Sequence, residues 1–176
     1  MSAPPAVSIM GGSGMGKTTL VERLLPALRG QGLRVGVVKH SSDPHPLHRE
    51  NSDTARFEQA EAAFVAFATP AGVQLTVREP PSSALLPLLE RFGDTVDLVL
   101  VEGWKNGPLP KLEVWREGHG PLLAAGRPEV MAIVTDAPAL PEGAPPGARR
   151  FGLEDVQGLA VFIARWARER TQVDRQ

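Results

Sequence analysis

The sequence has no cysteine, no excess of either charge and no long apolar run, and each absence excludes a class of protein. Without cysteine, the 176 residues can form no disulfide, thiolate metal site or cysteine nucleophile. The 19 lysines and arginines against 20 aspartates and glutamates leave a formal net charge of −1, which favours neither nucleic acid nor a membrane surface as a partner. No apolar run approaches the roughly 18 residues that span a bilayer, and the amino terminus lacks a signal-peptide layout. We therefore expect a cytoplasmic protein.

What is present points to one folded domain. Hydrophobic residues make up 42% of the chain, which is enough for a buried core, and the length suits one domain of ordinary size. There is no internal repeat and no linker long enough to divide the chain, so we expect a single domain over residues 1–176.

Apolar patterning predicts alternating strands and helices. Pro26 should kink the first helix or end it early, and the four prolines between residues 138 and 147 predict a loop. Regular alternation of the two element types predicts an α/β fold with a mainly parallel sheet flanked by helices. The expected strands cover residues 6–10, 33–39, 62–68, 73–77, 96–101, 111–116 and 130–134, and the expected helices cover 17–30, 52–60, 83–92 and 153–170.

The segment Gly11–Thr18 matches the pattern G-x-x-x-x-G-K-[ST] of a phosphate-binding loop, or P-loop, and lies between a predicted strand and a predicted helix. Its glycines let the backbone wrap around a phosphate with N–H groups turned inward, and the following helix presents the positive end of its dipole. Lys17 should reach the β- and γ-phosphates, and the Thr18 hydroxyl should ligate Mg²⁺. The G-x-G-x-x-G spacing of dinucleotide-binding loops is missing. The segment therefore predicts binding of a nucleoside triphosphate.

Two further acidic residues follow predicted buried strands. Glu102 ends the run Val96–Val101, and carboxylates at that end of a parallel strand lie where open α/β sheets bind ligands. We expect Glu102 to organise Mg²⁺ or water, whereas Asp97, at the other end of the run, should be an ordinary strand-boundary acid. Asp136 follows another strand and could accept hydrogen bonds from a guanine edge, although the N-K-x-D motif is missing. A cap or turn role is the alternative for Asp136.

Three of the four histidines lie within one polar loop: His40, His45 and His48. Imidazole and carboxylate ligands would suit Zn²⁺ or Ni²⁺, but the spacing matches no compact zinc template, so solvated loop histidines are the alternative. A third interpretation places this loop beside the nucleotide, where phosphates, Mg²⁺ or a second anion could be contacted by Lys39, Asp43 or Asp53. Asp53 could instead pair with the dipole of the helix that it begins.

With these features placed, the chain resembles the MobB family, the GTP-binding adaptors of molybdopterin-guanine dinucleotide biosynthesis. The Lys39-His40 pair and the run DLVLVEGWK at residues 97–105 are more distinctive than the P-loop, which many families share. Further matching stretches follow in the family's order: Gly12–Leu20, Gly32–His40, Asn51–Ala62, Lys111–Gly118 and Ala132–Pro138. The chain departs from the family in two stretches where glycine is usual, which here are Asn51-Ser52-Asp53 and Ala60-Glu61-Ala62.

The resemblance implies a P-loop fold of the GTPase-like adaptor and metallochaperone group, a homodimer and weak GTP hydrolysis, with GTP and Mg²⁺ as cofactors. It also implies a partnership with MobA, the guanylyltransferase that joins GMP to molybdopterin, and names molybdopterin or its guanine dinucleotide as a further candidate ligand.

Carried over residue by residue, the resemblance assigns the triphosphate to Gly12, Ser13, Gly14, Met15, Gly16, Lys17, Thr18 and Thr19. Thr18, Asp53 and Glu102 would serve the Mg²⁺ or water side, and Lys17, Glu102 and Asp53 would act in hydrolysis. Asp136 would face the guanine. The crevice for a phosphate or pterin partner would be lined by Lys39, His40 and Lys105.

Two other functions remain open from the residues alone. A small-molecule P-loop kinase fits the length and the motif, but such kinases close an arginine-bearing lid, and the one compact arginine pair is Arg149-Arg150. A nickel-delivery GTPase fits the histidine loop. Preference for GTP over ATP separates the adaptor from the kinase, and stoichiometric Ni²⁺ binding would favour the nickel protein.

Overall fold

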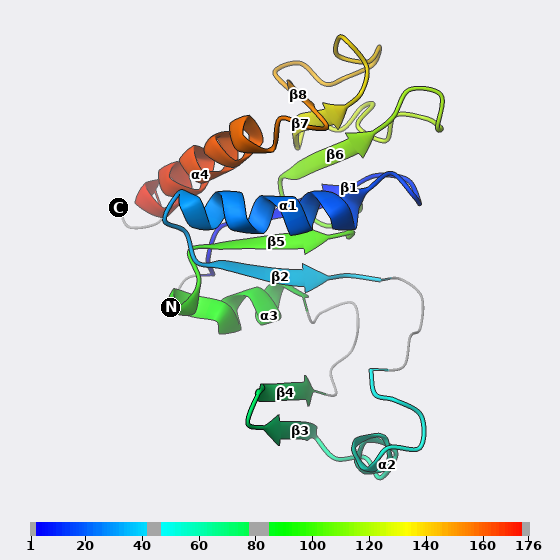
Figure 1. The fold of residues 1–176 in the computed structure, drawn as a ribbon, viewed down its shortest axis with the longest axis vertical. Coiled ribbons are helices and arrows are strands. Elements are labelled where there is room, and N and C mark those ends of the chain that lie inside the picture. The colour runs from blue at the N-terminus through cyan, green and yellow to red at the C-terminus, as the bar shows by residue number, and fades with distance from the viewer. Residues whose placement is uncertain (1–2, 42–46, 78–84, 174–176) are drawn as a thin grey trace. The chain divides into compact units, whose positions relative to one another are not determined.

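The structure is a computed structural model that describes residues 3–41, 47–77 and 85–173 (Figure 1). The chain divides into two compact units, one made of Met1–His40 and Leu89–Gln176 and the other of Ser41–Leu88. They are named here the sheet unit and the hairpin unit. That residues 1–176 act as one nucleotide-binding domain stays a prediction. Within the described ranges, no helix has both the length and the apolar character needed to cross a membrane.

The sheet unit is built on six parallel strands in the order β2-β5-β1-β6-β7-β8. Strands β1 and β5 lie inside the sheet and are buried on both faces, as their continuous apolar sequences predict. The predicted α/β fold, with a mainly parallel sheet flanked by helices, is confirmed. The strand bounds are β1 Ala6–Met10, β2 Val35–Lys39, β5 Leu98–Glu102, β6 Lys111–Trp115, β7 Val130–Thr135 and β8 Arg149–Gly152.

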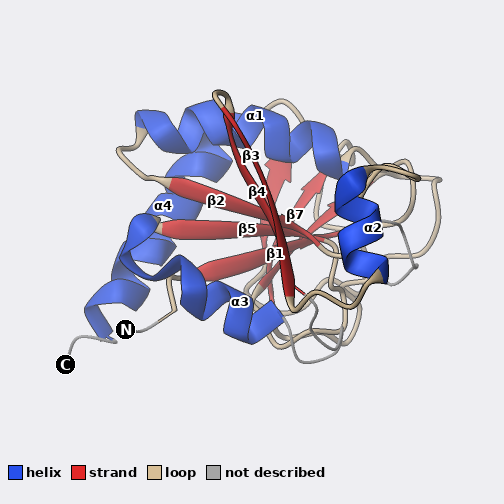
Figure 2. Cartoon of the chain, turned by 90° about the horizontal axis from the view of Figure 1, so that it is seen from below, coloured by secondary structure: helices blue, strands red, loops and turns tan. Residues whose placement is uncertain are grey.

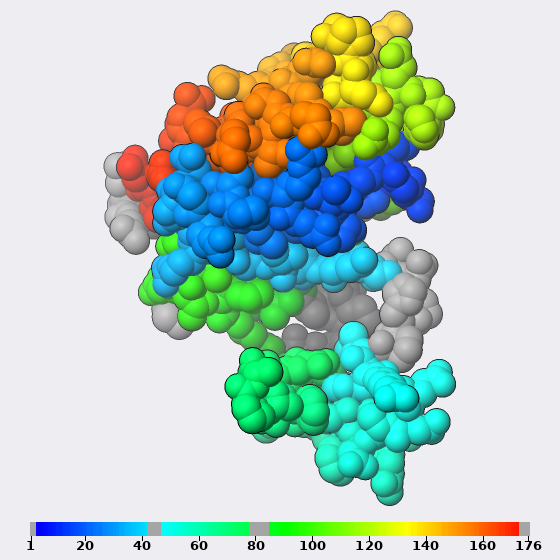
Figure 3. Space-filling model, in the orientation of Figure 1, coloured from blue at the N-terminus to red at the C-terminus, as the bar shows by residue number. Residues whose placement is uncertain are grey.

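Two long helices, α1 (Lys17–Gly30) and α4 (Val156–Val173), cover one face of this sheet. They lie side by side in Figures 1 and 2, and in Figure 3 their side chains form one continuous surface. Full burial of one large aliphatic side chain contributes about 1.5–3 kcal/mol, so this layer holds much of the core's stabilisation. The fully buried side chains that the two helices bring to it include Leu24, Leu28, Leu159 and Ile163. The short helices α3 (Leu85–Phe92) and η1 (Gly93–Thr95) precede β5.

The hairpin unit contains helix α2 (Asp53–Gln59) and two antiparallel strands, β3 (Phe64–Thr69) and β4 (Gly72–Val77). The Ser52 side chain caps α2 by accepting a hydrogen bond of 3.2 Å from the backbone N–H of Ala55. The helix and both strands that the sequence predicts in this region are confirmed, with ends shifted by one or two residues.

Helix α1 spans the predicted residues 17–30, with Pro26 inside it. The helix continues past this proline to Gly30 instead of ending early. Pro26 is exposed, so water can reach the carbonyl that the missing proline N–H leaves unpaired. The next two residues, Ala27 and Leu28, are buried in the core, and this packing outweighs the lost backbone hydrogen bond. The sequence also predicts that Ser82 or Ser83 caps α3, and both serines lie outside the described residues.

Strand β8 was not expected from the sequence. Its four residues include two exposed arginines and one buried side chain, Phe151, so no apolar pattern marks it. It forms because it pairs in parallel with β7. The prediction that α4 begins near Leu153 is wrong for the same reason, since the chain is still leaving β8 there. The helix begins at Val156, after Asp155 accepts a hydrogen bond of 3.0 Å from the N–H of Gly158.

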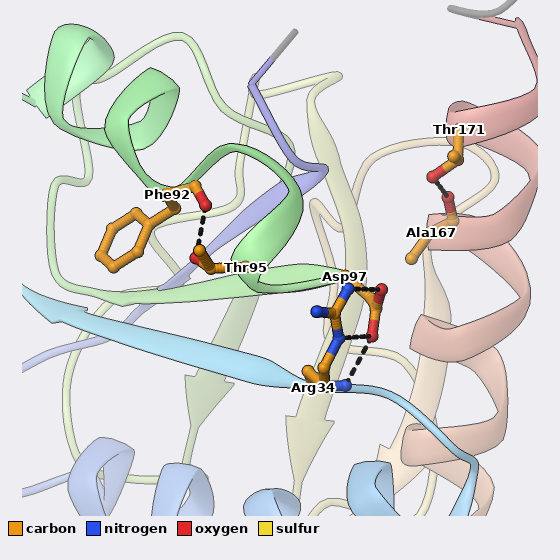
Figure 4. Close-up of polar contacts among 6 residues, drawn as sticks. All are labelled: Arg34, Phe92, Thr95, Asp97, Ala167 and Thr171. Atoms are coloured by element: carbon orange, nitrogen blue, oxygen red, sulfur yellow. Dashed lines mark hydrogen bonds and ion pairs between the residues drawn. The ribbon is translucent and has the colours of Figure 1, made fainter. Parts of the chain in front are cut away.

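An ion pair joins the beginnings of β2 and β5, at the amino-terminal edge of the sheet (Figure 4). The Arg34 guanidinium donates to the two carboxylate oxygens of Asp97 at 3.1 and 2.8 Å, and the Arg34 backbone N–H donates to one of them at 2.8 Å. The hydrogen bonds from the guanidinium hold the pKa of Asp97 below its ordinary value. Asp97 is therefore a strand-boundary acid with a structural partner, as predicted.

Two residues other than glycine take left-handed backbone conformations near the ends of α2. Asn51 has a φ of 61° and Glu61 a φ of 65°, and both lie in the stretches where the resembled family usually has glycine. After α2, the Glu61 N–H donates to the Glu58 carbonyl at 3.0 Å and the Ala62 N–H to the Phe57 carbonyl at 3.3 Å. This pattern ends many helices and favours glycine at the left-handed position.

Replacing Glu61 with glycine should raise the free energy of unfolding of the hairpin unit by about 1 kcal/mol, because glycine takes a left-handed backbone without a steric penalty. Gln59→Gly, at an exposed position in the last turn of α2, is the matched control. It should lower the same free energy by about 0.5–1 kcal/mol. Hydrogen exchange of the α2 and β3 amides measures both changes, and similar losses in the two variants would show that Glu61 is unstrained.

Candidate functional site

The glycine-rich loop connects β1 to α1, in the strand–loop–helix context that the sequence predicts. Gly14 and Gly16 have φ values of 74° and 94°, which a side chain would strain. The Lys17 ammonium donates a hydrogen bond of 2.7 Å to the Gly12 carbonyl and so lies across the loop. A loop of this form, closed by a lysine at a helix N-terminus, is suited to hold phosphates.

Three other predicted phosphate-binding positions differ in exposure. Ser13 and Thr19 are exposed, whereas Met15 is 5% exposed and its side chain belongs to the core beneath the loop. Met15 therefore offers only its backbone to a ligand and anchors the loop through its side chain. That these positions contact a triphosphate stays a prediction.

The Thr18 hydroxyl and the Glu102 carboxylate meet beside this loop. Thr18 donates a hydrogen bond of 2.9 Å to Glu102 Oε1, and Lys39 Nζ lies 3.9 Å from the same oxygen. The sheet brings these groups together, because Glu102 pairs with Ile9 of β1 on one side and with Lys39 of β2 on the other. The Glu102 side chain is 12% exposed and that of Lys39 is 71% exposed, so the carboxylate lies deeper than the amine. A hydroxyl and a carboxylate are oxygen ligands that suit Mg²⁺.

The backbone after Glu102 is held from both neighbouring strands. Gly103 has a φ of 94°, and a Cβ there would lie 2.5 Å from the His40 carbonyl oxygen, so only glycine fits. The Gly103 N–H donates to the Ile9 carbonyl at 2.9 Å, and the buried Ser8 hydroxyl donates to the Gly103 carbonyl. The His40 N–H donates to the Glu102 carbonyl at 2.9 Å. These hydrogen bonds fix the backbone that carries Glu102 beside the P-loop.

Of the residues predicted to line the crevice, His40 has a ring contact with Trp104, and Lys105 directly follows Trp104 in the sequence. The His40 and Trp104 rings are tilted by 34° with their centres 6.0 Å apart. The Lys105 side chain is exposed, while its carbonyl accepts a hydrogen bond from Arg127. The loop after β5 therefore carries one exposed cation, Lys105, and its backbone is held by the hydrogen bond from Arg127.

A buried lysine holds the same loop from the sheet side. Lys111 begins β6, its side chain is 0% exposed, and its ammonium donates to the carbonyls of Gly107 and Leu109 at 2.5 and 2.7 Å. The Glu129 carboxylate lies 3.8 Å from the ammonium. Burial lowers the pKa of Lys111 below that of a free lysine. Lys111 is therefore structural, and its role could not be predicted from the sequence, because a lysine at the start of a strand is usually exposed.

Asp136 follows β7 at the same edge of the sheet. Its Oδ1 accepts a hydrogen bond of 3.0 Å from the Glu117 N–H, and its Oδ2 lies 3.7 Å from an Arg116 nitrogen. The hydrogen bond from Glu117, with a smaller contribution from the Arg116 charge, lowers the pKa of Asp136. The side chain is 41% exposed, so the ionised carboxylate can still accept hydrogen bonds from a ligand.

Arg116 is a site residue that the sequence analysis missed. Its Nε donates to the Met15 carbonyl of the P-loop at 3.4 Å, while the far end of its guanidinium faces Asp136. The sequence alone does not single out Arg116, because its place in the site depends on the register between β6 and β7. Arg116 follows β6 and Asp136 follows β7, and these strands pair in parallel with Trp115 opposite Thr135. The next residue on each strand therefore lies beside the other.

The remaining predicted residues lie in or near the hairpin unit. Asp53 begins α2, and its role toward phosphate or Mg²⁺ stays a prediction. The side chain of His48 is 5% exposed, with Nε2 3.9 Å from a Glu58 oxygen, so the solvated interpretation is wrong for this histidine. His45 and Asp43 lie outside the described residues. Within the part of the chain that the structure describes, no three histidine, aspartate or glutamate side chains gather as a metal site.

Known proteins match most of this chain. The family model "MobB: Molybdopterin guanine dinucleotide synthesis protein B" matches residues 6–136. The molybdopterin-guanine dinucleotide biosynthesis adapter protein of Escherichia coli (strain K12) is 32% identical over 172 residues, which cover 92% of this chain and 93% of the relative. The protein of the same name from Haemophilus influenzae is 36% identical over 135 residues, 76% of each chain. The crystal structure of Bacillus subtilis MobB has a TM-score of 0.66 at 26% identity, over 90% of this chain and 95% of that one.

Replacing Lys111 with methionine removes the buried ammonium and leaves the Gly107 and Leu109 carbonyls without their donor. We expect the free energy of unfolding to fall by about 1–3 kcal/mol, the cost of leaving a buried polar group unpaired. Lys105→Met, at an exposed lysine of the same loop, is the control and should change it by less than about 0.5 kcal/mol. Urea denaturation measures both variants, and equal effects would contradict the role assigned to Lys111.

Proposed function

The chain belongs to the MobB family and acts in molybdopterin-guanine dinucleotide biosynthesis, and within that role we propose that it is a GTP-binding adaptor with weak GTPase activity. We propose further that it works in the cytoplasm and assists the MobA-type guanylyltransferase. A GTP-binding adaptor needs a phosphate site, a way to recognise guanine and a surface for its partner, and each has candidate residues.

The observation that carries this proposal is the hydrogen bond between Thr18 and Glu102, directly beside the P-loop and Lys17. A phosphate cradle alone could bind any anion. A hydroxyl and a carboxylate next to it supply the hard oxygen ligands that a nucleotide's Mg²⁺ requires. The residues present therefore fit a nucleoside triphosphate with Mg²⁺ better than they fit a free phosphate.

In the proposed complex, the backbone N–H groups of Gly12–Gly16 donate to the phosphate oxygens, and the hydroxyls of Thr18 and Thr19 lie at the start of α1 beside them. The Lys17 ammonium exchanges its bond to the Gly12 carbonyl for the β- and γ-phosphate oxygens. Bound Mg²⁺ supplies positive charge that neutralises the phosphate oxygens.

Hydrolysis needs a water molecule placed in line with the γ-phosphate, and Glu102 is the candidate to orient it. Its carboxylate is 12% exposed and lies 2.9 Å from Thr18 Oγ1, and it could serve as a ligand to Mg²⁺ or accept a hydrogen bond from water. Lys17 stabilises the negative charge that develops on the phosphate oxygens. Asp53 remains a candidate for the same Mg²⁺ or water side.

Guanine recognition is assigned to Asp136. A carboxylate accepts hydrogen bonds, and the guanine edge offers two neighbouring donors, N1–H and the exocyclic amine. Adenine presents an acceptor at its ring N1, which a carboxylate repels. A low pKa keeps Asp136 ionised, which is the state that this recognition requires.

The partner surface is assigned to the loops around Lys39, His40 and Lys105. Both lysines are exposed at the carboxyl edge of the sheet, where they can meet a phosphate of molybdopterin or of its guanine dinucleotide. The guanylyltransferase would then meet the adaptor across the bound nucleotide.

We also propose that the adaptor is a homodimer, formed through the hairpin unit. The pairing of β3 with β4, in which Phe64 lies opposite Val77, puts only apolar side chains on one face of the hairpin. Phe64, Val73 and Leu75 on this face are 65%, 72% and 59% exposed. A two-stranded hairpin is marginally stable in water, so a second copy covering this face would stabilise it. The residues of the face are Phe64, Ala66, Ala68, Val73, Leu75 and Val77.

Calorimetric titration with GTP and ATP in the presence of Mg²⁺ tests the nucleotide function. The protein should bind GTP more tightly than ATP, and Lys17→Ala should abolish binding of both. Glu102→Gln should still bind GTP but hydrolyse it about 100-fold more slowly, as expected for loss of a general base. Unchanged turnover in Glu102→Gln would exclude its role in hydrolysis, and tighter binding of ATP would move the small-molecule kinase ahead of the adaptor.

Sedimentation equilibrium tests the homodimer. The protein should sediment as a dimer at micromolar concentration, and Leu75→Asp should make it a monomer, because a charge would then be buried at the centre of the apolar face. Gln74→Asp places the same charge on the opposite face of β4 and should leave the dimer intact. A monomeric wild-type protein, or equal dissociation in both variants, would reject this interface.

A further inference from the structure

Arg116 lies between the two halves of the proposed nucleotide site. On one side, its Nε donates to the Met15 carbonyl at 3.4 Å, and another of its nitrogens lies 3.7 Å from where a Cβ on Gly16 would be. On the other side, it lies 3.7 Å from Asp136 Oδ2. One guanidinium therefore touches the phosphate loop and faces the carboxylate assigned to guanine.

The P-loop is the rigid end of this bridge. The Met15 side chain is buried beneath the loop, and the loop's turns are set by glycines with left-handed backbone. The Lys17 bond to the Gly12 carbonyl closes the loop without help from Arg116. Since the loop holds its own form, the bond from Arg116 to Met15 fixes the arginine rather than the loop.

Asp136 is the end that needs to be held. It is exposed on a loop, and both of its carboxylate oxygens have partners from the end of β6: Oδ1 accepts from the Glu117 N–H, and Oδ2 faces Arg116. With one partner on each oxygen, the plane of the carboxylate is set. Each oxygen keeps a lone pair for a further donor, and two donors side by side are what a guanine edge presents.

We propose that Arg116 is a positioning residue for base specificity: by linking Asp136 to the Met15–Gly16 turn, it aims the carboxylate at guanine relative to the bound phosphates. The inference rests on the proposed GTP binding and deepens it. Triphosphate contacts are the same in GTP and ATP, so a residue that acts through Asp136 should change the difference in affinity between the two nucleotides.

An arginine suits this position better than a lysine would. Its planar fork presents several N–H donors in fixed directions, so one side chain can serve the Met15 carbonyl and the Asp136 carboxylate together. A lysine ammonium would keep the charge but could not span both partners with the same geometry. Comparing arginine with lysine at position 116 therefore separates the effect of the positive charge from the effect of contacting both partners.

The experiment measures the Kd of GTP and of ATP, with Mg²⁺, for the full-length protein and Arg116→Gln. Loss of the bridge should weaken GTP binding about tenfold, equivalent to about 1.4 kcal/mol, and change ATP binding by less than about twofold. Arg116→Lys should recover part of the GTP affinity. Equal weakening of both nucleotides would overturn the inference, because it would place Arg116 on the phosphates or in the folding of the loop.

A second arm tests whether Arg116 acts through Asp136. In an Asp136→Asn background, adding Arg116→Gln should leave the ratio of the two Kd values unchanged, whereas a further fall in GTP affinity would mean that Arg116 contacts the base directly. Arg34→Gln breaks an arginine–aspartate pair at the opposite edge of the sheet and serves as the matched control. It should leave the ratio unaltered.

The two proposals fail differently. A wild-type protein without preference for GTP overturns both the guanine assignment and the role of Arg116. A wild-type protein that prefers GTP, with the preference intact in Arg116→Gln, overturns only the role of Arg116. Retained ATP binding in each variant shows that the fold and the P-loop are intact.

Discussion

Six strands that run in one direction end at one edge of the sheet, and the candidate site depends on this constraint. β1 carries the P-loop from the inside of the sheet. On one flank, β5 and β2 bring Glu102 and Lys39 to the phosphate side. On the other flank, β6 and β7 bring together Arg116 and Asp136, the residues proposed to act on the base. The strand order therefore places the residues proposed to bind phosphate on one flank of the P-loop and those proposed to recognise the base on the other.

The sequence was most informative where a local pattern is enough to define an element. β1 and α1 begin and end where the apolar runs and glycines predict, and Glu102 was found because a carboxylate directly follows a buried run. The sequence was least informative where an element exists only through its neighbour. β8 has one buried side chain and forms by pairing with β7, and Arg116 becomes a site residue only when the register of β6 and β7 is known.

Buried charges in β6 were also beyond sequence reasoning, and they show how the loops around the site are held. Lys111 and Glu113 lie two residues apart, so both point to the same face of the sheet. Lys111 donates to the loop before β6, and the Glu113 carboxylate accepts from the N–H groups of Leu123 and Ala124 at 2.8 and 2.6 Å in the loop after it. Burial raises the pKa of Glu113 above its ordinary value, and the hydrogen bonds from Leu123 and Ala124 oppose this rise. The hydrogen bonds to Lys111 and Glu113 give the two loops, which have no regular secondary structure, defined paths beside the site.

The left-handed residues beside α2 have a consequence for how this protein responds to heat. A glycine at Asn51 or Glu61 would relieve strain, which is an energy that changes little with temperature. It would also give the unfolded chain more conformations, and that entropic penalty grows in proportion to absolute temperature. On warming, the entropic penalty grows while the strain energy stays nearly constant. The net stabilisation that glycine would give therefore becomes smaller. A helix bracketed by asparagine and glutamate therefore has less to gain from glycine at these two positions in warm solution than in cold solution.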